Sequence, residues 1–146
     1  MLKKTITYED YNGDTVTDDF YFNLTKVECM ELEYSFGENS TLSGTIKTLV
    51  DSKDVGALIA AIKKILLMSY GVKTPDGKRF IKNDTVREEF EQSPAFEVIY
   101  WQLVTDTDEA ANFISGIVPQ VVRDSLGENP KQALLDQMQQ SMNTSE

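Results

Sequence analysis

The chain has no histidine among its 146 residues and a single cysteine, Cys29. Without histidine it lacks the commonest general base, the usual zinc ligand, and any serine or cysteine nucleophile activated by histidine. One cysteine cannot form an internal disulfide, so Cys29 fits a reducing compartment such as the cytoplasm. These absences predict a protein that is not an enzyme and that holds no metal or cofactor.

Basic residues are also scarce, because 14 Lys and Arg stand against 24 Asp and Glu, for a net charge of -10. The excess of acidic residues lies in residues 1–50 and in residues 101–146, each with a net charge of -5, while residues 51–100 have equal numbers of acidic and basic residues. A negative exterior repels phosphate backbones, so nucleic-acid binding is disfavoured. The charge suits a basic partner or one whose apolar surface must be kept soluble, and it equally fits simple solubility.

No apolar run is long enough to span a membrane, and the longest candidate, residues 54–70, is interrupted by Lys63 and Lys64. Its apolar residues recur at helical spacing and cover most of the circumference, which predicts a central helix buried on several sides. The stripe consists of Val55, Leu58, Ile62, Ile65 and Leu66. We expect the rest of the chain to pack around this helix.

Two alternating segments, residues 2–8 and 16–24, predict an N-terminal antiparallel hairpin. Asn12-Gly13 suggests a two-residue turn, but that register would turn the aromatic residues away from the core. A three-residue loop with Gly13 in the left-handed conformation pairs Tyr8 with Val16 instead. Since one residue of slip exchanges the two faces of a strand, burial should select the longer loop.

The remaining segments predict a mainly helical body of about six helices, with a small second hairpin near residues 72–81, and thus an α+β fold. Start signals occur at Thr25, at Thr41 or Ser40, and at Ser93, and the Thr74-Pro75-Asp76-Gly77 run is typical of a turn. Asp84 or Thr85 should begin another helix, and Gly116 should end the last one before Pro119. We expect one domain over residues 1–119, followed by a helical or partly disordered tail over residues 120–146.

Three groups of polar residues could suggest chemistry, and each has a simpler explanation. Asp10, Asn12 and Asp14 begin like a calcium loop, but Thr15 and Tyr21 replace its required Gly and Glu. Two clusters of acidic residues could be taken for acid/base pairs, but they should lie in the first turns or on the solvated faces of helices. The first cluster is Glu88, Glu89 and Glu91, and the second is Asp106, Asp108 and Glu109. Neighbouring Glu28 and Glu31 should raise the pKa of Cys29, the opposite of an activated nucleophile.

Four ordered blocks give the chain a resemblance to a known family. They are YGVK at 70–73, DGKRFIK at 76–82, SPAF at 93–96 and AANFISGIVP at 110–119. With the acidic hairpin and the central helix, they resemble the tail assembly chaperones of long-tailed phages (siphoviruses) of Gram-positive bacteria. The resemblance covers roughly residues 1–119, and residues 120–146 depart from any strong pattern.

This resemblance implies a non-enzymatic protein made during virion morphogenesis in the host cytoplasm. Such chaperones bind the long, largely helical tape measure protein, keep it soluble, and recruit tail tube (major tail) subunits around it. They are absent from the finished particle, and many also occur as a longer frameshifted form. The alternative hypothesis is a structural virion protein, such as a tail completion or connector subunit.

Masking a tape measure helix requires apolar surface on the chaperone, and aromatic residues near helix ends are candidates. We predict partner contacts at Tyr34, Phe36, Tyr100 and Trp101, although for Trp101 burial in the core is the stronger expectation. The basic second hairpin is predicted to contact a neighbouring copy in a homo-oligomer. The simpler alternative is that its charged side chains are only exposed to the solvent. Its residues are Lys73, Lys78, Arg79, Phe80 and Lys82.

Overall fold

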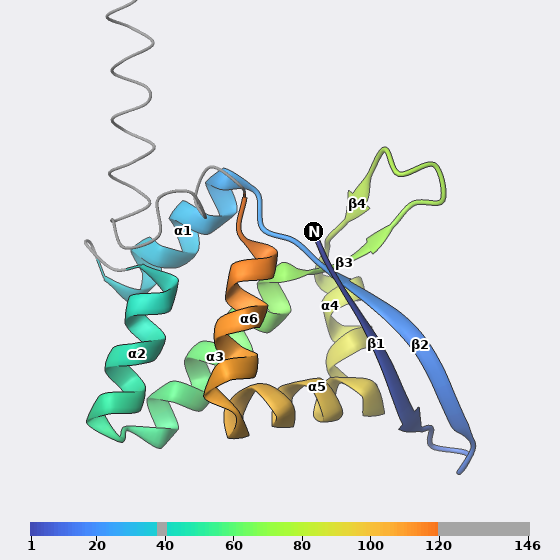
Figure 1. Ribbon diagram of the computed structural model, residues 1–146. Coiled ribbons are helices and arrows are strands. Elements are labelled where there is room, and N and C mark those ends of the chain that lie inside the picture. The colour runs from blue at the N-terminus through green and yellow to red at the C-terminus, as the bar shows by residue number, and fades with distance from the viewer. Residues whose placement is uncertain (38–40, 120–146) are drawn as a thin grey trace, which may run out of the picture.

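The computed structural model describes residues 1–37 and 41–119, which form two hairpins and six helices (Figure 1). The predicted α+β class is therefore confirmed. In chain order the elements are β1 (Leu2–Glu9), β2 (Thr15–Phe22), α1 (Lys26–Phe36), α2 (Leu42–Ser52), α3 (Val55–Ser69), β3 (Tyr70–Lys73), β4 (Phe80–Ile81), α4 (Asp84–Glu91), α5 (Pro94–Thr105) and α6 (Thr107–Ile117).

The N-terminal hairpin has the register that burial predicted, with Tyr8 opposite Val16. The N–H of Asp10 donates to the carbonyl of Asp14 at 2.9 Å, and Gly13 is left-handed with φ 85°. The carboxylate of Asp10 accepts from the N–H groups of Asn12 and Asp14, both at 2.9 Å. The oxygen-rich sequence therefore serves to close the turn.

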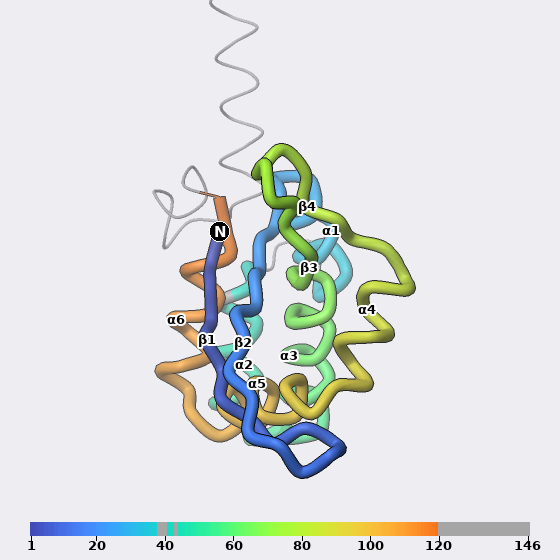
Figure 2. Tube along the Cα trace, turned by 90° about the vertical axis from the view of Figure 1, so that its right-hand side faces the viewer, coloured from blue at the N-terminus to red at the C-terminus, as the bar shows by residue number. Residues whose placement is uncertain are grey.

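Both hairpins belong to one sheet, with strand order β1-β2-β3-β4 (Figure 2). β2 pairs with β3 through Tyr21 opposite Gly71 and Phe22 opposite Tyr70, and β3 pairs with β4 through Val72 opposite Ile81. The sequence predicted each hairpin but not the pairing between them. This pairing fixes the C-terminal end of the central helix against the N-terminal strands.

The helix starts follow the capping signals, with two corrections. Thr25 forms the predicted capping box with Glu28, and Ser93 caps a helix that begins with Pro94. α4 begins at Asp84, one of the two predicted starts, but its cap is Asn83, whose side chain accepts from the N–H of Val86. Gly116 does not end α6, which continues to Ile117, and the glycine instead admits the Leu2 side chain.

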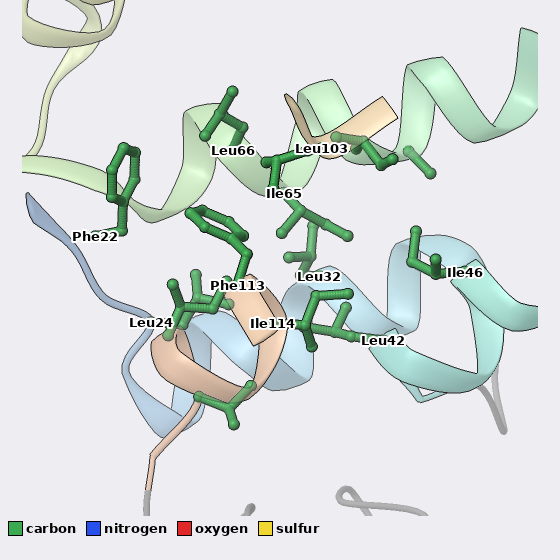
Figure 3. Packing of buried hydrophobic residues seen from close by; sticks show 14 of the residues in the cluster. Phe22, Leu24, Leu32, Leu42, Ile46, Ile65, Leu66, Leu103, Phe113 and Ile114 are labelled. Atoms are coloured by element: carbon green, nitrogen blue, oxygen red, sulfur yellow. The ribbon is translucent and has the colours of Figure 1, made fainter. Parts of the chain in front are cut away.

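The core lies between the sheet and the helices, and Figure 3 shows side chains from the strands and helices meeting there. α3 contributes buried residues only from its C-terminal half, namely Ala61, Ile62, Ile65, Leu66 and Ser69. The prediction that the whole apolar stripe is covered is wrong for its first residue, since Val55 is 61% exposed. Ile59, beside the stripe, is 37% exposed, so the N-terminal half of α3 is covered less than its C-terminal half.

The C-terminal tail predicted for residues 120–146 lies outside the described residues, so the boundary at residue 119 stays a prediction. Among the helices the structure describes, none has both the length and the apolar character needed to cross a bilayer.

Candidate protein-binding surfaces

A groove with a volume of about 190 Å³ lies between α2 and α6. Ile46 and Val50 line it from α2, and Ala111 and Ile114 line it from α6. Lys47, Asp51 and Thr107 complete the lining. The volume is below the roughly 300–1,000 Å³ of small-molecule sites, so the groove fits a few apolar side chains of a partner protein.

Helical spacing places these residues on facing surfaces. Ile46 and Val50 are four residues apart on α2, and Thr107, Ala111 and Ile114 recur at four and three residues on α6. The small side chain of Ala111 leaves the hollow between the two helices. The sequence predicted inward faces for both helices, but it contained no signal that α2 and α6 would be neighbours.

The predicted aromatic contact residues divide into exposed and packed side chains. Tyr34 is 61% exposed and Trp101 is 67% exposed, so the expected burial of Trp101 is wrong. The core face of α5 is formed by Ala95, Ile99 and Leu103, and Trp101 lies on the opposite side of the helix. Both side chains therefore present most of their surface to the solvent.

Phe36 and Tyr100 are half-buried within the fold. Phe36 lies under the ammonium group of Lys64, at 5.5 Å from the ring centroid. Tyr100 stacks on Phe96 with centroids 5.4 Å apart, and its hydroxyl donates to the carbonyl of Ile59 at 2.8 Å. These contacts anchor the two rings and leave only part of each for a partner.

The second hairpin extends from the helical body (Figure 1), and Lys73, Lys78 and Arg79 on it are exposed. Phe80 lies across Gly71, where a Cβ would stand only 2.6 Å from the ring. Glycine is therefore needed for this close approach between β3 and β4. Lys73, Lys78 and Arg79 keep their predicted availability to a neighbouring copy.

Lys82 is instead an internal residue, with 11% of its side chain exposed. Its ammonium group donates to the carbonyl of Asn23 at 2.6 Å and to both carboxylate oxygens of Glu28 at 2.8 and 2.9 Å. The contact joins the start of α4 to the capping box of α1. Lys82 therefore holds two distant segments together rather than facing another copy.

The electrostatics of this pair show two opposing effects. Burial alone would raise the pKa of Glu28, but hydrogen bonds from Lys82 and from the N–H of Thr25 outweigh it and lower that pKa. Burial also lowers the pKa of Lys82, and the attraction to Glu28 only partly compensates. The pair is thus held by geometry and hydrogen bonding at some desolvation cost.

A buried acid, Glu33, was not predicted from the sequence. Its carboxylate accepts from the N–H of Leu42 at 3.1 Å, at the start of α2, and from the thiol of Cys29 at 3.5 Å. Burial, followed by the nearby Glu33, raises the pKa of Cys29. The predicted direction is confirmed, but the cause is burial and Glu33 rather than Glu28 and Glu31. The position of Glu33 next to Leu32 gave no sequence signal of its burial.

The carboxylates considered for catalysis have structural roles where the structure defines them. Asp106 caps α6 by accepting from the N–H groups of Asp108 and Glu109, and Glu91 pairs with Lys63 at 2.9 Å. Within residues 1–37 and 41–119, no group of three or more Cys, Asp or Glu side chains could hold a metal ion.

The surface features so far are those of a binding protein: an apolar groove, exposed aromatic residues and a negative charge. A family model described as phage tail assembly chaperone matches residues 1–146, the whole chain. The chain belongs to this family. As a tail assembly chaperone it binds tail proteins and acts during assembly in the host cell. The match confirms the resemblance to phage tail assembly chaperones and extends it beyond residue 119, while the assignment to siphoviruses of Gram-positive bacteria stays a prediction. No curated protein and no solved structure matches the chain.

Proposed function

We propose that this tail assembly chaperone binds the tape measure protein through the groove between α2 and α6. The observation that carries the proposal is the apolar lining of the groove by Ile46, Val50, Ala111 and Ile114. Partner helices commonly dock by inserting apolar side chains at i, i+3 and i+4 into such grooves. A tape measure protein, with its long apolar helical stripes, is a partner of this chemistry.

The exposed aromatic residues would extend this contact beyond the groove. Trp101 and Tyr34 each present a large ring to the solvent, and aromatic residues are enriched among the anchors of protein interfaces. One groove of this size would bind weakly. Many copies along one tape measure rod would gain affinity from multivalency.

Several finer features belong to the same proposal. The chaperone recruits tail tube subunits, forms homo-oligomers through Lys73, Lys78 and Arg79 of the second hairpin, and leaves before the virion is complete. It acts in the host cytoplasm by binding alone and makes or breaks no covalent bond. Residues 1–119 form the chaperone domain. Mass spectrometry of purified particles tests the departure, since a structural tail protein would be present there.

Co-expression with a tape measure fragment that carries its apolar helical stripe tests the central step. The full chain should keep the fragment in the soluble fraction and should co-purify with it. Ala111→Glu places a charge at the exposed lining of the groove and should return most of the fragment to the insoluble fraction.

Asn112→Glu provides the matched control, because it makes the same charge change at the next residue of α6, which does not line the groove. This variant should behave like the unmodified chain. If the fragment is equally insoluble with and without the chaperone, the proposed function is wrong. If Ala111→Glu and Asn112→Glu act alike, the assignment to the groove is wrong.

A further inference from the structure

β1 is the outermost strand of the sheet, and one of its two edges has no neighbouring strand (Figure 2). The bond from Asp10 to Asp14 fixes which residues of β1 direct their backbone groups toward β2, because these residues alternate in an antiparallel ladder. Every second residue before Asp10 therefore bonds to β2. The backbone groups of the others point away from the sheet, namely those of Lys3, Thr5, Thr7 and Glu9.

These outward backbone groups make no hydrogen bond to any other part of the chain that the structure describes. Their side chains are all exposed, so within residues 1–37 and 41–119 nothing covers the solvent-facing side of this edge. An eight-residue strand with a free edge is a template for pairing with another strand. The question is which strand fits.

A second copy of β1 fits in one particular register. Two antiparallel copies related by a two-fold axis can satisfy all four outward residues only if Lys3 lies opposite Glu9 of the other copy and Thr5 lies opposite Thr7. This register places opposite charges together at both ends of the paired strands, and opposite-charge pairs stabilise sheets. A shift by two residues would place Thr5 opposite Thr5, Lys3 opposite Thr7 and Glu9 opposite Met1, so the charged side chains of Lys3 and Glu9 would no longer lie opposite each other.

Lysine side chains on an edge strand often prevent such pairing, because another strand would leave their charges without a partner. In a dimer, the charges of Lys3 and Lys4 must therefore each lie near an acidic group. Lys4, on the core-facing side, already pairs with Glu109 at 3.6 Å and has only 15% of its side chain exposed. Lys3 reaches Asp19 only at 4.0 Å and keeps 56% of its side chain exposed. Glu9 of a second copy would complete the neutralisation of Lys3.

We propose that the chaperone forms a two-fold symmetric dimer in which the free edges of β1 pair antiparallel, with Lys3 of each copy opposite Glu9 of the other. The two four-stranded sheets then form one continuous sheet. The contact is isologous and closes on itself, and it buries backbone groups rather than the groove between α2 and α6. It does not depend on the proposed binding of the tape measure protein.

Sedimentation equilibrium of the full chain and three charge variants tests the register. The unmodified chain should be a dimer at micromolar concentration. Lys3→Glu and Glu9→Lys each put like charges opposite at both ends, and each should weaken the dimer about tenfold or more. The double variant Lys3→Glu/Glu9→Lys restores opposite charges and should recover most of the affinity. Lys26→Glu, at an exposed position of α1 outside both proposed contacts between copies, should leave the dimer unchanged.

A backbone variant tests the pairing independently of charge. Thr7→Pro removes an N–H that points outward, so it takes no hydrogen bond from the β1–β2 ladder and should yield a folded monomer by circular dichroism. A monomeric unmodified chain, a double variant as weak as the single ones, or a dimer that survives Thr7→Pro would overturn the inference. A monomer that still keeps the tape measure fragment soluble would overturn the inference and leave the proposed binding of the tape measure protein standing.

Discussion

Replacing Lys82 by methionine should destabilise the fold substantially, because it removes the cation that joins β4 and α4 to the capping box of α1. The variant keeps most of the apolar stem but loses the hydrogen bonds to Asn23 and Glu28. Breaking a fully buried ion pair costs about 3–5 kcal/mol. Because 22% of the Glu28 side chain is exposed and Thr25 still donates to it, we expect about 2 kcal/mol.

Thermal unfolding followed by circular dichroism measures this loss, and about 2 kcal/mol corresponds to a decrease in Tm of about 4–8 °C. Lys63→Met is the matched control, since Lys63 pairs with Glu91 at a similar 2.9 Å but with 47% of its side chain exposed. An exposed pair contributes about 0.2–1 kcal/mol, so the control should lower Tm by at most about 4 °C and by less than Lys82→Met.

The pH dependence of stability provides a second check on the same pair. The pKa of Glu28 lies below its ordinary value of 4.5 in the folded protein. A carboxyl group with a lowered pKa stabilises the fold above its unfolded pKa, and this contribution is lost as the pH falls through the folded pKa. Stability should therefore fall below about pH 4.5 more steeply in the unmodified chain than in Lys82→Met. Equal Tm changes for the two lysine variants would refute the reasoning, as would a Lys82→Met variant that changes only the oligomeric state.

Three further predictions concern other parts of the molecule. Tyr8 donates to Asp18 at 2.6 Å, and this hydrogen bond, followed by burial, raises its pKa to about 12. Burial also raises the pKa values of Tyr70 and Tyr100, so an ultraviolet absorbance titration of the unmodified chain and of Asp18→Asn should differ by one late tyrosine, whose pKa the substitution returns toward 10. Gly56→Ala should increase the free energy of unfolding by up to about 1 kcal/mol in a denaturant titration. Gly116→Ala should leave the free energy of unfolding unchanged or lower it, because the added Cβ would lie 3.0 Å from the Leu2 side chain. Trp101→Ala should leave the unfolding midpoint nearly unchanged but weaken binding of the tape measure fragment in a fluorescence titration.

Local sequence signals predicted most of the secondary structure because each has a short-range physical cause. The hairpin register followed from the burial of alternating residues, and most of the helix starts followed from side chains that cap free N–H groups. The errors at Asn83 and Gly116 have the same origin. A cap can be formed by a neighbouring residue of similar chemistry, and a glycine near a helix end can serve a tertiary contact instead of ending the helix.

The binding surfaces were harder to predict because they depend on which elements become neighbours. The groove requires α2 and α6 to lie side by side although their nearest ends are far apart in the sequence. Lys82 belonged to an apparently exposed basic run, and only its contact with Glu28 shows that it is internal. Trp101 appeared to be a core residue by its size, whereas the helix turns it away from the core.

Amide hydrogen exchange of the full chain, with and without the tape measure fragment, tests most directly whether the chaperone covers the apolar helices of another protein. The account predicts slower exchange in residues 46–50 of α2 and residues 107–114 of α6, and no such change in Ala111→Glu. Unchanged exchange in both helices at saturating fragment, or protection confined to other elements, would contradict it.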